Sequence, residues 1–297
     1  MFKSGFVSII GRPNSGKSTL LNQLLGEKVS IVSDKPQTTR HNILGILTQK
    51  EGQIVFKDTP GIHKPEFELN RRMMQWLYDA LQGVDLLLTI VDASTSFGAG
   101  DQFVIELLQK QKIPTFLLLN KVDLIQKKNL LPLISFYAEK YSFEEIVPIS
   151  ALKKDNLGLL LTLILKHLTE GPPHFPEDQF TDKHERFLVG ELVREKILHH
   201  TREELPFSIA VFVNRFQERD DQFVFLACDI VVERQSQRKI VIGSQGQMLK
   251  QIGTEARADI EKLLGKRVYL ELFVKVQPDW RNDPRFLDSI EITGSAS

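Results

Sequence analysis

The residues most able to do chemistry stand near the start of the chain, in the octapeptide at residues 11–18. It fits the pattern G-x-x-x-x-G-K-[ST] and lies between an apolar run, Phe6–Ile10, and a helical pattern. In such a loop the backbone N–H groups point at phosphate oxygens, and the helix N-terminus adds partial positive charge. Lys17 can meet the β- and γ-phosphates, and the Ser18 hydroxyl can ligate Mg²⁺. The predicted phosphate-binding residues are Gly11, Arg12, Pro13, Asn14, Ser15, Gly16, Lys17 and Ser18.

A second polar segment, residues 58–61, follows a short apolar run that ends at Lys57. A carboxylate at a strand end can hold Mg²⁺ opposite a phosphate loop, usually through water, so Asp58 is a candidate for the metal. The N–H of Gly61 is placed to meet the γ-phosphate. The tetrapeptide alone could be an ordinary turn, but its position downstream of a phosphate loop favours nucleotide binding. The predicted binding residues here are Asp58, Thr59, Pro60, Gly61 and Ile62.

A third segment, residues 120–123, follows the apolar run Thr115–Leu119 and indicates which base is bound. The Asp123 carboxylate can accept hydrogen bonds from N1–H and the exocyclic amine of guanine, whereas adenine has no such pair of donors. A carboxylate left unpaired against adenine is costly, which argues against an ATP-dependent kinase. A backbone N–H of Ser150-Ala151 can bond guanine O6. The predicted base-binding residues are Asn120, Lys121, Val122, Asp123, Ser150 and Ala151.

The ordered set of motifs resembles the translation-factor class of GTPases over residues 6–168. The resemblance implies hydrolysis of GTP to GDP and phosphate, and a first switch in which a threonine closes over Mg²⁺ and the γ-phosphate. Thr38 and Thr39 both fit this role, and we favour Thr39. The expected Mg²⁺ ligands are Ser18, Thr39 and Asp58, and the expected catalytic or switch residues are Asn14, Lys17, Thr39 and Gly61.

One position departs from the pattern of Ras-like GTPases. Ile62 stands where they carry a glutamine that positions water, and isoleucine cannot orient water by hydrogen bonding. Hydrolysis should therefore be slow or depend on other groups. Asn14 resembles a residue that recruits K⁺ in a subset of GTPases, although it could equally stabilise the turn of the loop.

The elements that must position these residues alternate between strand and helix up to Leu168. Such alternation predicts an α/β domain with a mostly parallel sheet covered by helices on both faces. The segment from Gly171 to Pro176 contains three prolines and predicts a semi-rigid linker. We therefore expect a GTPase domain over residues 1–170 and a linker over residues 171–182.

The rest of the chain follows a different order: helix, strand, strand, helix, helix, strand, within residues 183–282. The helix Lys183–Thr201 has the candidate core residues Phe187, Leu188, Leu192 and Ile197. We expect a strand at Ile240–Ile242, a hairpin turn at Glu218–Asp221, and a helical pattern over Gly246–Leu264 that Gly253 interrupts. No familiar pattern occurs in the tail, residues 283–297.

The segment Gly243–Gly246 contains G-x-x-G, and this α+β domain looks like a type II KH RNA-binding domain, whose loop clamps single-stranded RNA. Residues 234–281 carry ten Lys or Arg against five Asp or Glu, in a chain whose formal net charge is zero. The predicted RNA-binding residues are Arg238, Lys239, Gly243, Ser244, Gln245, Gly246 and Lys250.

A GTPase domain followed by a KH domain resembles the Era family of bacterial ribosome-assembly GTPases over nearly the whole chain. The resemblance rests on segments at residues 36–41, 174–178, 204–206 and 270–276. It implies binding near the 3′ end of 16S rRNA, maturation of the small (30S) subunit, a monomer, and a cytoplasmic location with peripheral attachment to the inner membrane. The alternative is a signalling GTPase whose second domain binds protein.

Bulk properties agree with these expectations without deciding between them. We find no secretory leader and no run of about 18 uncharged apolar residues. Cys228 is the only cysteine, so no internal disulfide can form, and a reducing compartment fits best. We expect Cys228 to be a small buried apolar side chain.

Overall fold

A computed structural model describes residues 1–61, 66–202 and 205–292 of the chain. The sequence prediction made for Ile62 falls outside these residues. The chain forms two compact units. The first comprises Met1–Ser30, Thr39–Lys64 and Met73–Asp182, and the second comprises Ile31–Thr38, Pro65–Arg72 and Lys183–Ser297.

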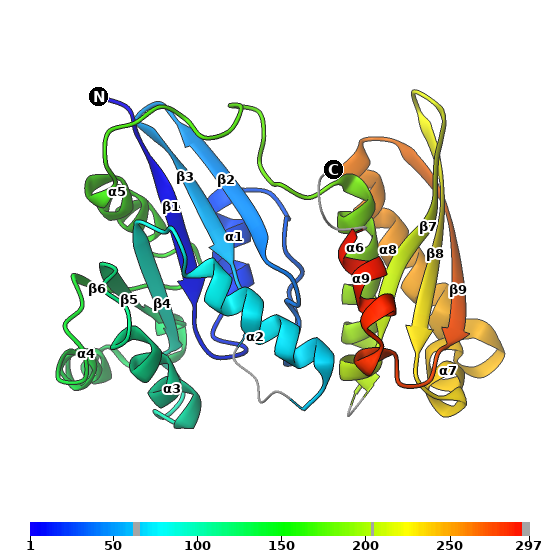
Figure 1. The fold of residues 1–297 in the computed structure, drawn as a ribbon, viewed down its shortest axis with the longest axis horizontal. Helices are drawn as coiled ribbons and strands as arrows, with labels where there is room; N and C mark the ends of the chain where they lie inside the picture. The colour runs from blue at the N-terminus through cyan, green and yellow to red at the C-terminus, as the bar shows by residue number, and fades with distance from the viewer. Residues whose placement is uncertain (62–65, 203–204, 293–297) are drawn as a thin grey trace. The chain divides into compact units, whose positions relative to one another are not determined.

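The first unit is built on a six-stranded sheet (Figure 1), in the order β2-β3-β1-β4-β5-β6. The strands β2 and β3 pair antiparallel, and the other neighbours pair parallel. The strands are β1 (Lys3–Ile10), β2 (Ile43–Gln49), β3 (Gly52–Asp58), β4 (Leu86–Asp92), β5 (Thr115–Asn120) and β6 (Glu145–Pro148). The helices between them are α1 (Lys17–Leu25), α2 (Glu68–Ala80), α3 (Ala99–Leu108), α4 (Leu130–Ala138) and α5 (Leu157–His167).

Helices cover both faces of this sheet, as the continuous apolar strands require. On one face, Leu77 of α2 and Leu108 of α3 pack against Leu87 of β4, and Tyr137 of α4 packs against β5. On the other face, α1 lies against β2 and β3. The strands β4 and β5 are buried along nearly their whole length, so the predicted α/β fold is confirmed.

The second unit contains a three-stranded sheet in the order β7-β8-β9 (Figure 1). The strands β7 and β8 pair antiparallel, and β8 and β9 pair parallel. The elements are α6 (Glu185–His200), β7 (Ala210–Asp220), β8 (Phe223–Val232), α7 (Gln235–Ile242), α8 (Gln247–Leu264), β9 (Arg267–Val276) and α9 (Pro284–Ile292). Up to β9 this is the predicted order αββααβ.

The core of the second unit lies between one face of its sheet and the helices. Side chains at alternate positions of β8 pack with α6, α7 and α8, and Cys228 is buried among them, as expected. Burial raises the pKa of the Cys228 thiol to about 12. The candidate core residues of α6 are also buried: Phe187, Leu188, Leu192 and Ile197.

Three local predictions in this unit are wrong. Residues 240–242 end helix α7 rather than forming a strand, because the side chain of Gln237 accepts the N–H groups of Glu233 and Arg234 and caps that helix. Gly253 does not interrupt α8. The strand β7 continues to Asp220, whose side chain accepts the N–H of Gln222 in a tighter hairpin turn. The tail, in which no familiar pattern occurs, contains α9.

Candidate functional site

The phosphate loop connects β1 to α1 at the carboxyl edge of the first unit's sheet. Gly16 precedes α1 with φ 101°, a left-handed conformation that glycine adopts readily. A Cβ atom at Gly16 would also lie 2.3 Å from Asn120 Nδ2, so the close approach of these two segments requires glycine. The Nδ2 atom of Asn120 donates to the Ser15 carbonyl at 2.8 Å. The phosphate loop and the segment that begins at Asn120 lie far apart along the chain but are in direct contact in the fold.

Lys17 lies at the centre of the loop and is almost fully buried. Its Nζ donates to the carbonyl oxygens of Gly11 and Arg12, both at 3.0 Å. Burial lowers the pKa of Lys17 to about 8, although the charge of Asp58 opposes that shift. An anion beside the ammonium group would offset the cost of burying its charge.

Three oxygen-bearing side chains meet at the start of α1. The Ser18 hydroxyl donates to Asp58 Oδ2 at 2.9 Å and lies 2.8 Å from the Thr39 hydroxyl. Asp58 is fully buried, its Oδ1 atom has no hydrogen-bond partner within the described residues, and burial raises its pKa. Hydroxyl and carboxylate oxygens are ligands that Mg²⁺ prefers, and a cation would compensate the orphaned carboxylate oxygen. The residues present therefore fit a bound Mg²⁺.

The two candidate threonines of the first switch differ in what their hydroxyls contact. The Thr39 hydroxyl lies beside Ser18 and is a hydrogen-bond partner of the Asp58 carboxylate. The Thr38 hydroxyl instead donates to the Lys35 carbonyl at 2.5 Å. The geometry favours Thr39 as the metal ligand.

The remaining residues of the second motif support the loop. The Thr59 hydroxyl donates to the Ile9 carbonyl at 2.8 Å and is fully buried. Gly61 lies against Pro13, since a Cβ atom at Gly61 would be 3.0 Å from Pro13 Cγ. The segment Asp58–Gly61 therefore packs against the phosphate loop, with Gly61 half-buried and the three residues before it buried.

Arg12 was predicted to be a phosphate-binding residue, but its side chain is bonded to other side chains of the protein. Its guanidinium donates to Asp101 Oδ2 at 3.0 Å and to the Thr95 hydroxyl. Asp101 lies in the first turn of α3, is buried, and also accepts the N–H of Gly98, the residue that precedes the helix. The side chain of Arg12 is thus bound to the first turn of α3 and to Thr95 before it, and its backbone carbonyl accepts a hydrogen bond from Lys17.

The predicted base-binding residues converge on the opposite side of the loop. Lys121 Nζ bonds Asp92 at 2.6 Å and the Asn14 carbonyl at 2.9 Å. Asp123 is exposed, and the structure records no partner for its carboxylate in the described part of the chain. Ala151 N–H donates to Asn120 Oδ1 at 2.9 Å, and Ser150 N–H to the Asp155 carbonyl at 3.3 Å. A bond from either N–H to guanine O6 stays a prediction, because each already has an acceptor within the protein.

The G-x-x-G loop of the second unit joins α7 to α8 rather than a strand to a helix. Gly243 has φ 74°, and a Cβ atom there would lie 2.6 Å from Met248 Cβ. Ser244 and Gln245 are exposed at the turn, as are the cations Arg238 and Lys239 of α7 and Lys250 of α8. The predicted RNA-binding residues therefore gather around one loop.

Beside this loop lies a groove of about 420 Å³ between α8 and β9. Sequence reasoning found only its residues Gly246 and Lys250. Gly253 lines the groove, where a Cβ atom would make an ordinary contact of 3.4 Å with Leu272 Cδ1. The glycine that we expected to interrupt the helix therefore lies on the side of α8 that faces β9. The lining residues that sequence reasoning missed are Leu249, Gly253, Thr254, Arg257, Tyr269, Leu270 and Leu272.

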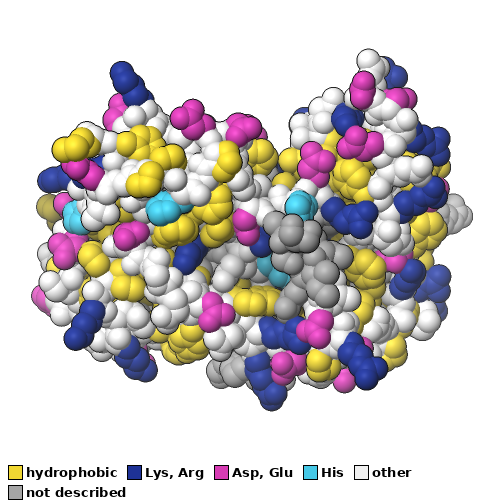
Figure 2. All heavy atoms as spheres, turned by 45° about the horizontal axis from the view of Figure 1, so that its top comes forward, with side chains coloured by type: hydrophobic (Ala, Val, Ile, Leu, Met, Phe, Trp, Pro, Cys, Tyr) yellow, Lys and Arg dark blue, Asp and Glu magenta, His cyan; other side chains and the backbone are white. Residues whose placement is uncertain are grey.

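On the face that Figure 2 shows, charge alone does not mark an interaction surface. Figure 2 shows basic and acidic side chains interspersed over the face in view, in agreement with the zero net charge. Affinity for a polyanion must therefore come from local groups such as those around the G-x-x-G loop.

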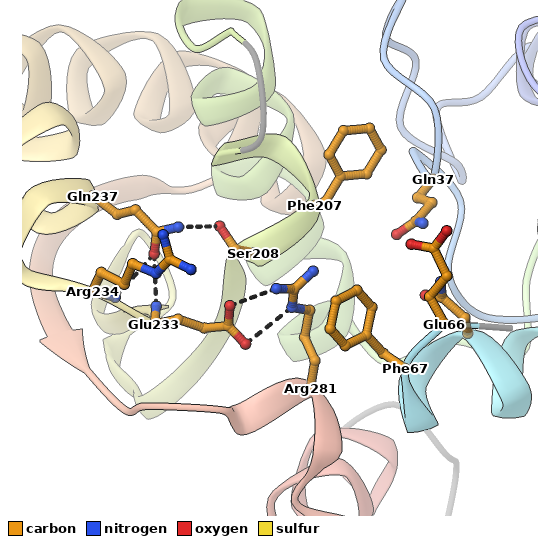
Figure 3. A pocket seen from close by; sticks show the side chains of 10 residues that line it. Gln37, Glu66, Phe67, Phe207, Ser208, Glu233, Arg234, Gln237 and Arg281 are labelled. Carbon is orange, nitrogen blue, oxygen red and sulfur yellow. Dashed lines mark hydrogen bonds and ion pairs between the residues drawn. The ribbon is translucent and has the colours of Figure 1, made fainter. Parts of the chain in front are cut away.

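The second unit has another cavity, of about 330 Å³, and several of the side chains that line it are bonded to one another (Figure 3). The Arg281 guanidinium donates twice to the Glu233 carboxylate, at 3.0 and 2.6 Å, and lies 3.8 Å from the ring centroid of Phe67. Gln237 Nε2 donates to the Ser208 hydroxyl at 2.9 Å. These pairings join four of the side chains that line the cavity, and none of its residues was predicted as a site residue.

The described residues contain no cluster of three or more His, Cys, Asp or Glu that could hold a metal ion. They also contain no helix with the length and apolar character needed to cross a bilayer.

Comparison with known proteins agrees with this division. Residues 6–121 match the family model described as a 50S ribosome-binding GTPase, and residues 204–281 match that of the KH domain. The chain is 44% identical to Era in a complex with MgGDPNP and nucleotides 1506–1542 of 16S ribosomal RNA, with a TM-score of 0.93. That match covers 97% of this chain and 98% of the other.

A variant of Aquifex aeolicus Era bound to GDP and AlF₄⁻ is also 44% identical, with a TM-score of 0.92 and the same coverage of both chains. Both similarities extend through the GTPase and KH domains, whose order and site residues are described above. The chain belongs to the Era family of GTPases.

Proposed function

We propose that this protein is a GTP-hydrolysing switch that binds the 3′ region of 16S rRNA through its KH domain and assists assembly and maturation of the 30S subunit. The observation that carries the proposal is the meeting of Ser18, Thr39 and Asp58 beside Lys17, on a chain that also carries an exposed G-x-x-G loop. The related Era complex with MgGDPNP and 16S rRNA supports both the nucleotide and the RNA.

In this proposal the chain's own residues hold and orient the nucleotide. Lys17, whose pKa is lowered by burial, regains a counter-charge when phosphate oxygens lie beside it. Mg²⁺ held by Ser18, Thr39 and Asp58 would neutralise charge on the β- and γ-phosphates. Asp123 accepts the guanine donors, and Lys121 ties the base-binding segment to the phosphate loop through the Asn14 carbonyl.

The proposal also includes a K⁺ ion bound at Asn14 during GTP hydrolysis. Arg12, the arginine within the phosphate loop, is bound by Asp101 and Thr95, so it is not placed to stabilise charge on the γ-phosphate. A monovalent cation at Asn14 would supply that charge. We expect faster GTP hydrolysis in K⁺ than in Na⁺, and loss of the difference in Asn14→Ala. Equal wild-type rates in both salts would leave Asn14 a purely structural residue.

The KH loop is tested with a charge change. Replacing both Ser244 and Gln245 by Asp adds two negative charges where RNA phosphates would lie. The matched control is Lys262→Asp, which changes the net charge equally at an 80% exposed side chain farther along α8. We expect the double variant to lose affinity for a 16S 3′-end oligonucleotide in fluorescence anisotropy and to keep its GTP affinity. The control should retain most of the RNA affinity.

The outcomes separate the candidate functions. Loss of RNA binding in the double variant alone supports the KH assignment. Equal affinity in both variants would reject the loop as the RNA site. Absence of wild-type RNA binding would favour the signalling GTPase whose second domain binds protein.

Location and oligomeric state belong to the same proposal and rest on the family resemblance. We propose a monomer in the cytoplasm with peripheral attachment to the inner membrane. Light scattering tests the monomer, and co-sedimentation with anionic vesicles tests the attachment, with neutral vesicles as the control.

A further inference from the structure

The three-stranded sheet of the second unit has an outer face, opposite the helices α6, α7 and α8. Helix α9 reaches one end of this face, where Phe286 packs against Phe212 of β7. Val224, Leu226 and Cys228 of β8 point into the core beneath α6, α7 and α8. Because side chains alternate along a strand, Phe225 points to the opposite face. Its neighbour in the register of β9 is Tyr269, which therefore lies on the same outer face.

Aromatic rings and arginines gather on this outer face. The rings of Phe225 and Tyr269 stack, with centroids 5.6 Å apart and planes inclined by 18°. The guanidinium groups of Arg215 and Arg219 lie 4.8 and 5.6 Å from the centroid of the Phe225 ring. We call Arg215, Arg219, Phe225 and Tyr269 the outer aromatic cluster.

The two rings of the outer aromatic cluster differ in their exposure to solvent. Phe225 is 9% exposed, whereas Tyr269 is 52% exposed. Within the described part of the chain, neither arginine of the cluster has an acidic partner in an ion pair. Phe273, four residues along β9 on the same face, is 47% exposed. Arg215 donates to Gln217 Oε1 at 2.6 Å, so its guanidinium keeps its charge without an acidic partner. An isolated exposed ring needs no explanation, but stacked rings beside positively charged guanidinium groups form a surface suited to the bases and phosphates of a single-stranded nucleic acid.

The cluster is continuous with the groove beside the G-x-x-G loop. Tyr269 lines that groove together with Lys250 and Arg257, and it also stacks on Phe225 of the outer face. Since β9 is the edge strand of the sheet, Tyr269 stands where the groove meets the outer face. A KH groove accommodates about four nucleotides, so a longer strand must leave it at one end or across this edge.

We propose that single-stranded RNA leaving the groove continues over the edge of β9, with a base stacked on Tyr269 and its phosphates near Arg215 and Arg219. The proposal rests on the proposed RNA-binding function and extends it to a second surface. Glu271 lies on the same face between Tyr269 and Phe273, and its carboxylate can accept a hydrogen bond from a base amine. Continuity with the groove favours RNA over a protein partner.

The test compares two oligonucleotides with the full chain. A five-nucleotide RNA fills the groove alone, and a twelve-nucleotide RNA also reaches the outer face. We expect Tyr269→Ala to weaken binding of the longer RNA by about 5- to 100-fold, the range for losing one stacked base. The shorter RNA should lose much less. Tyr269→Phe retains the ring and should retain the affinity for both.

Two further measurements separate stacking from indirect effects. A 2-aminopurine base placed beyond the groove-bound segment should be quenched by wild type and Tyr269→Phe but not by Tyr269→Ala. Arg215→Gln with Arg219→Gln should weaken the longer RNA and flatten its dependence on salt. Thermal unfolding checks that each variant is folded.

Each outcome decides the proposal. Equal loss for both RNA lengths in Tyr269→Ala would show that Tyr269 contacts RNA only within the groove that it lines, and would overturn the second surface. Unchanged affinity for both lengths would also overturn it and assign the outer face to another occupant, such as a protein. If the Ser244 and Gln245 double variant still loses RNA binding in that case, the proposed function stands while this inference fails.

Discussion

Replacing Thr39 by Ala tests whether this threonine, rather than Thr38, senses the γ-phosphate and Mg²⁺. The Thr39 hydroxyl lies 2.8 Å from the Ser18 hydroxyl and bonds the buried carboxylate of Asp58. Removing it takes one partner from a charged group, a loss of about 1.5–3 kcal/mol. That energy corresponds to about a 10- to 150-fold loss of affinity for Mg²⁺ with a GTP analogue. Affinity for GDP should change far less, because the threonine is expected to close over the γ-phosphate.

The adjacent residue provides the matched control. The Thr38 hydroxyl donates to the neutral Lys35 carbonyl, so Thr38→Ala should cost about 0.5–1.5 kcal/mol of local stability and little nucleotide affinity. Thr39→Ser keeps a hydroxyl and should keep most of the Mg²⁺ affinity.

The assay is a Mg²⁺ titration of fluorescent GDP and of a fluorescent non-hydrolysable GTP analogue, followed by single-turnover hydrolysis. A larger loss of analogue affinity in Thr38→Ala than in Thr39→Ala would refute the assignment. Equal losses in Thr39→Ser and Thr39→Ala would show that the hydroxyl is not the active group.

Three further predictions concern the same domain. Asp123→Asn should weaken GTP binding and move preference toward xanthosine nucleotide, whose 2-oxo group can accept from the new amide; an unchanged base preference in competition assays would contradict it. Arg12→Gln and Asp101→Asn should be non-additive by about 1–3 kcal/mol in a double-mutant cycle of unfolding, because each removes the same ion pair; additive effects would show that the pair contributes nothing. The pKa of Lys17 is lowered in the folded chain to about 8, so the unfolded chain binds more protons above that pH. The unfolding free energy should therefore rise with pH between about 8 and 10.5 in wild type relative to Lys17→Met, and parallel pH profiles of the two proteins would contradict this.

Much of the first unit could be predicted because its signals are local. The apolar runs before Asp58 and Asn120 predicted strands, and the carboxyl ends of parallel strands meet at one edge of a sheet. The order of the motifs along the chain was therefore enough to predict that the segments beginning at Asp58 and Asn120 lie at the same edge of the sheet as the phosphate loop. The second unit was predicted less well where a local signal had two explanations. Gly253 weakens a helix by its own propensity, yet α8 continues through it, and this position of the helix faces Leu272 of β9.

The phosphate loop, the base-binding segment and the KH loop could be predicted from the order of residues alone, because each prediction depends on residue types at short spacings along the chain. The fold was needed to show which threonine hydroxyl meets Asp58, where the Arg12 guanidinium points, and that Tyr269 both lines a groove and stacks on Phe225. Those outcomes depend on residues tens of positions apart, such as Arg12 with Asp101 and Phe225 with Tyr269. Side-chain direction at such sites follows from packing and strand register, which no local pattern encodes.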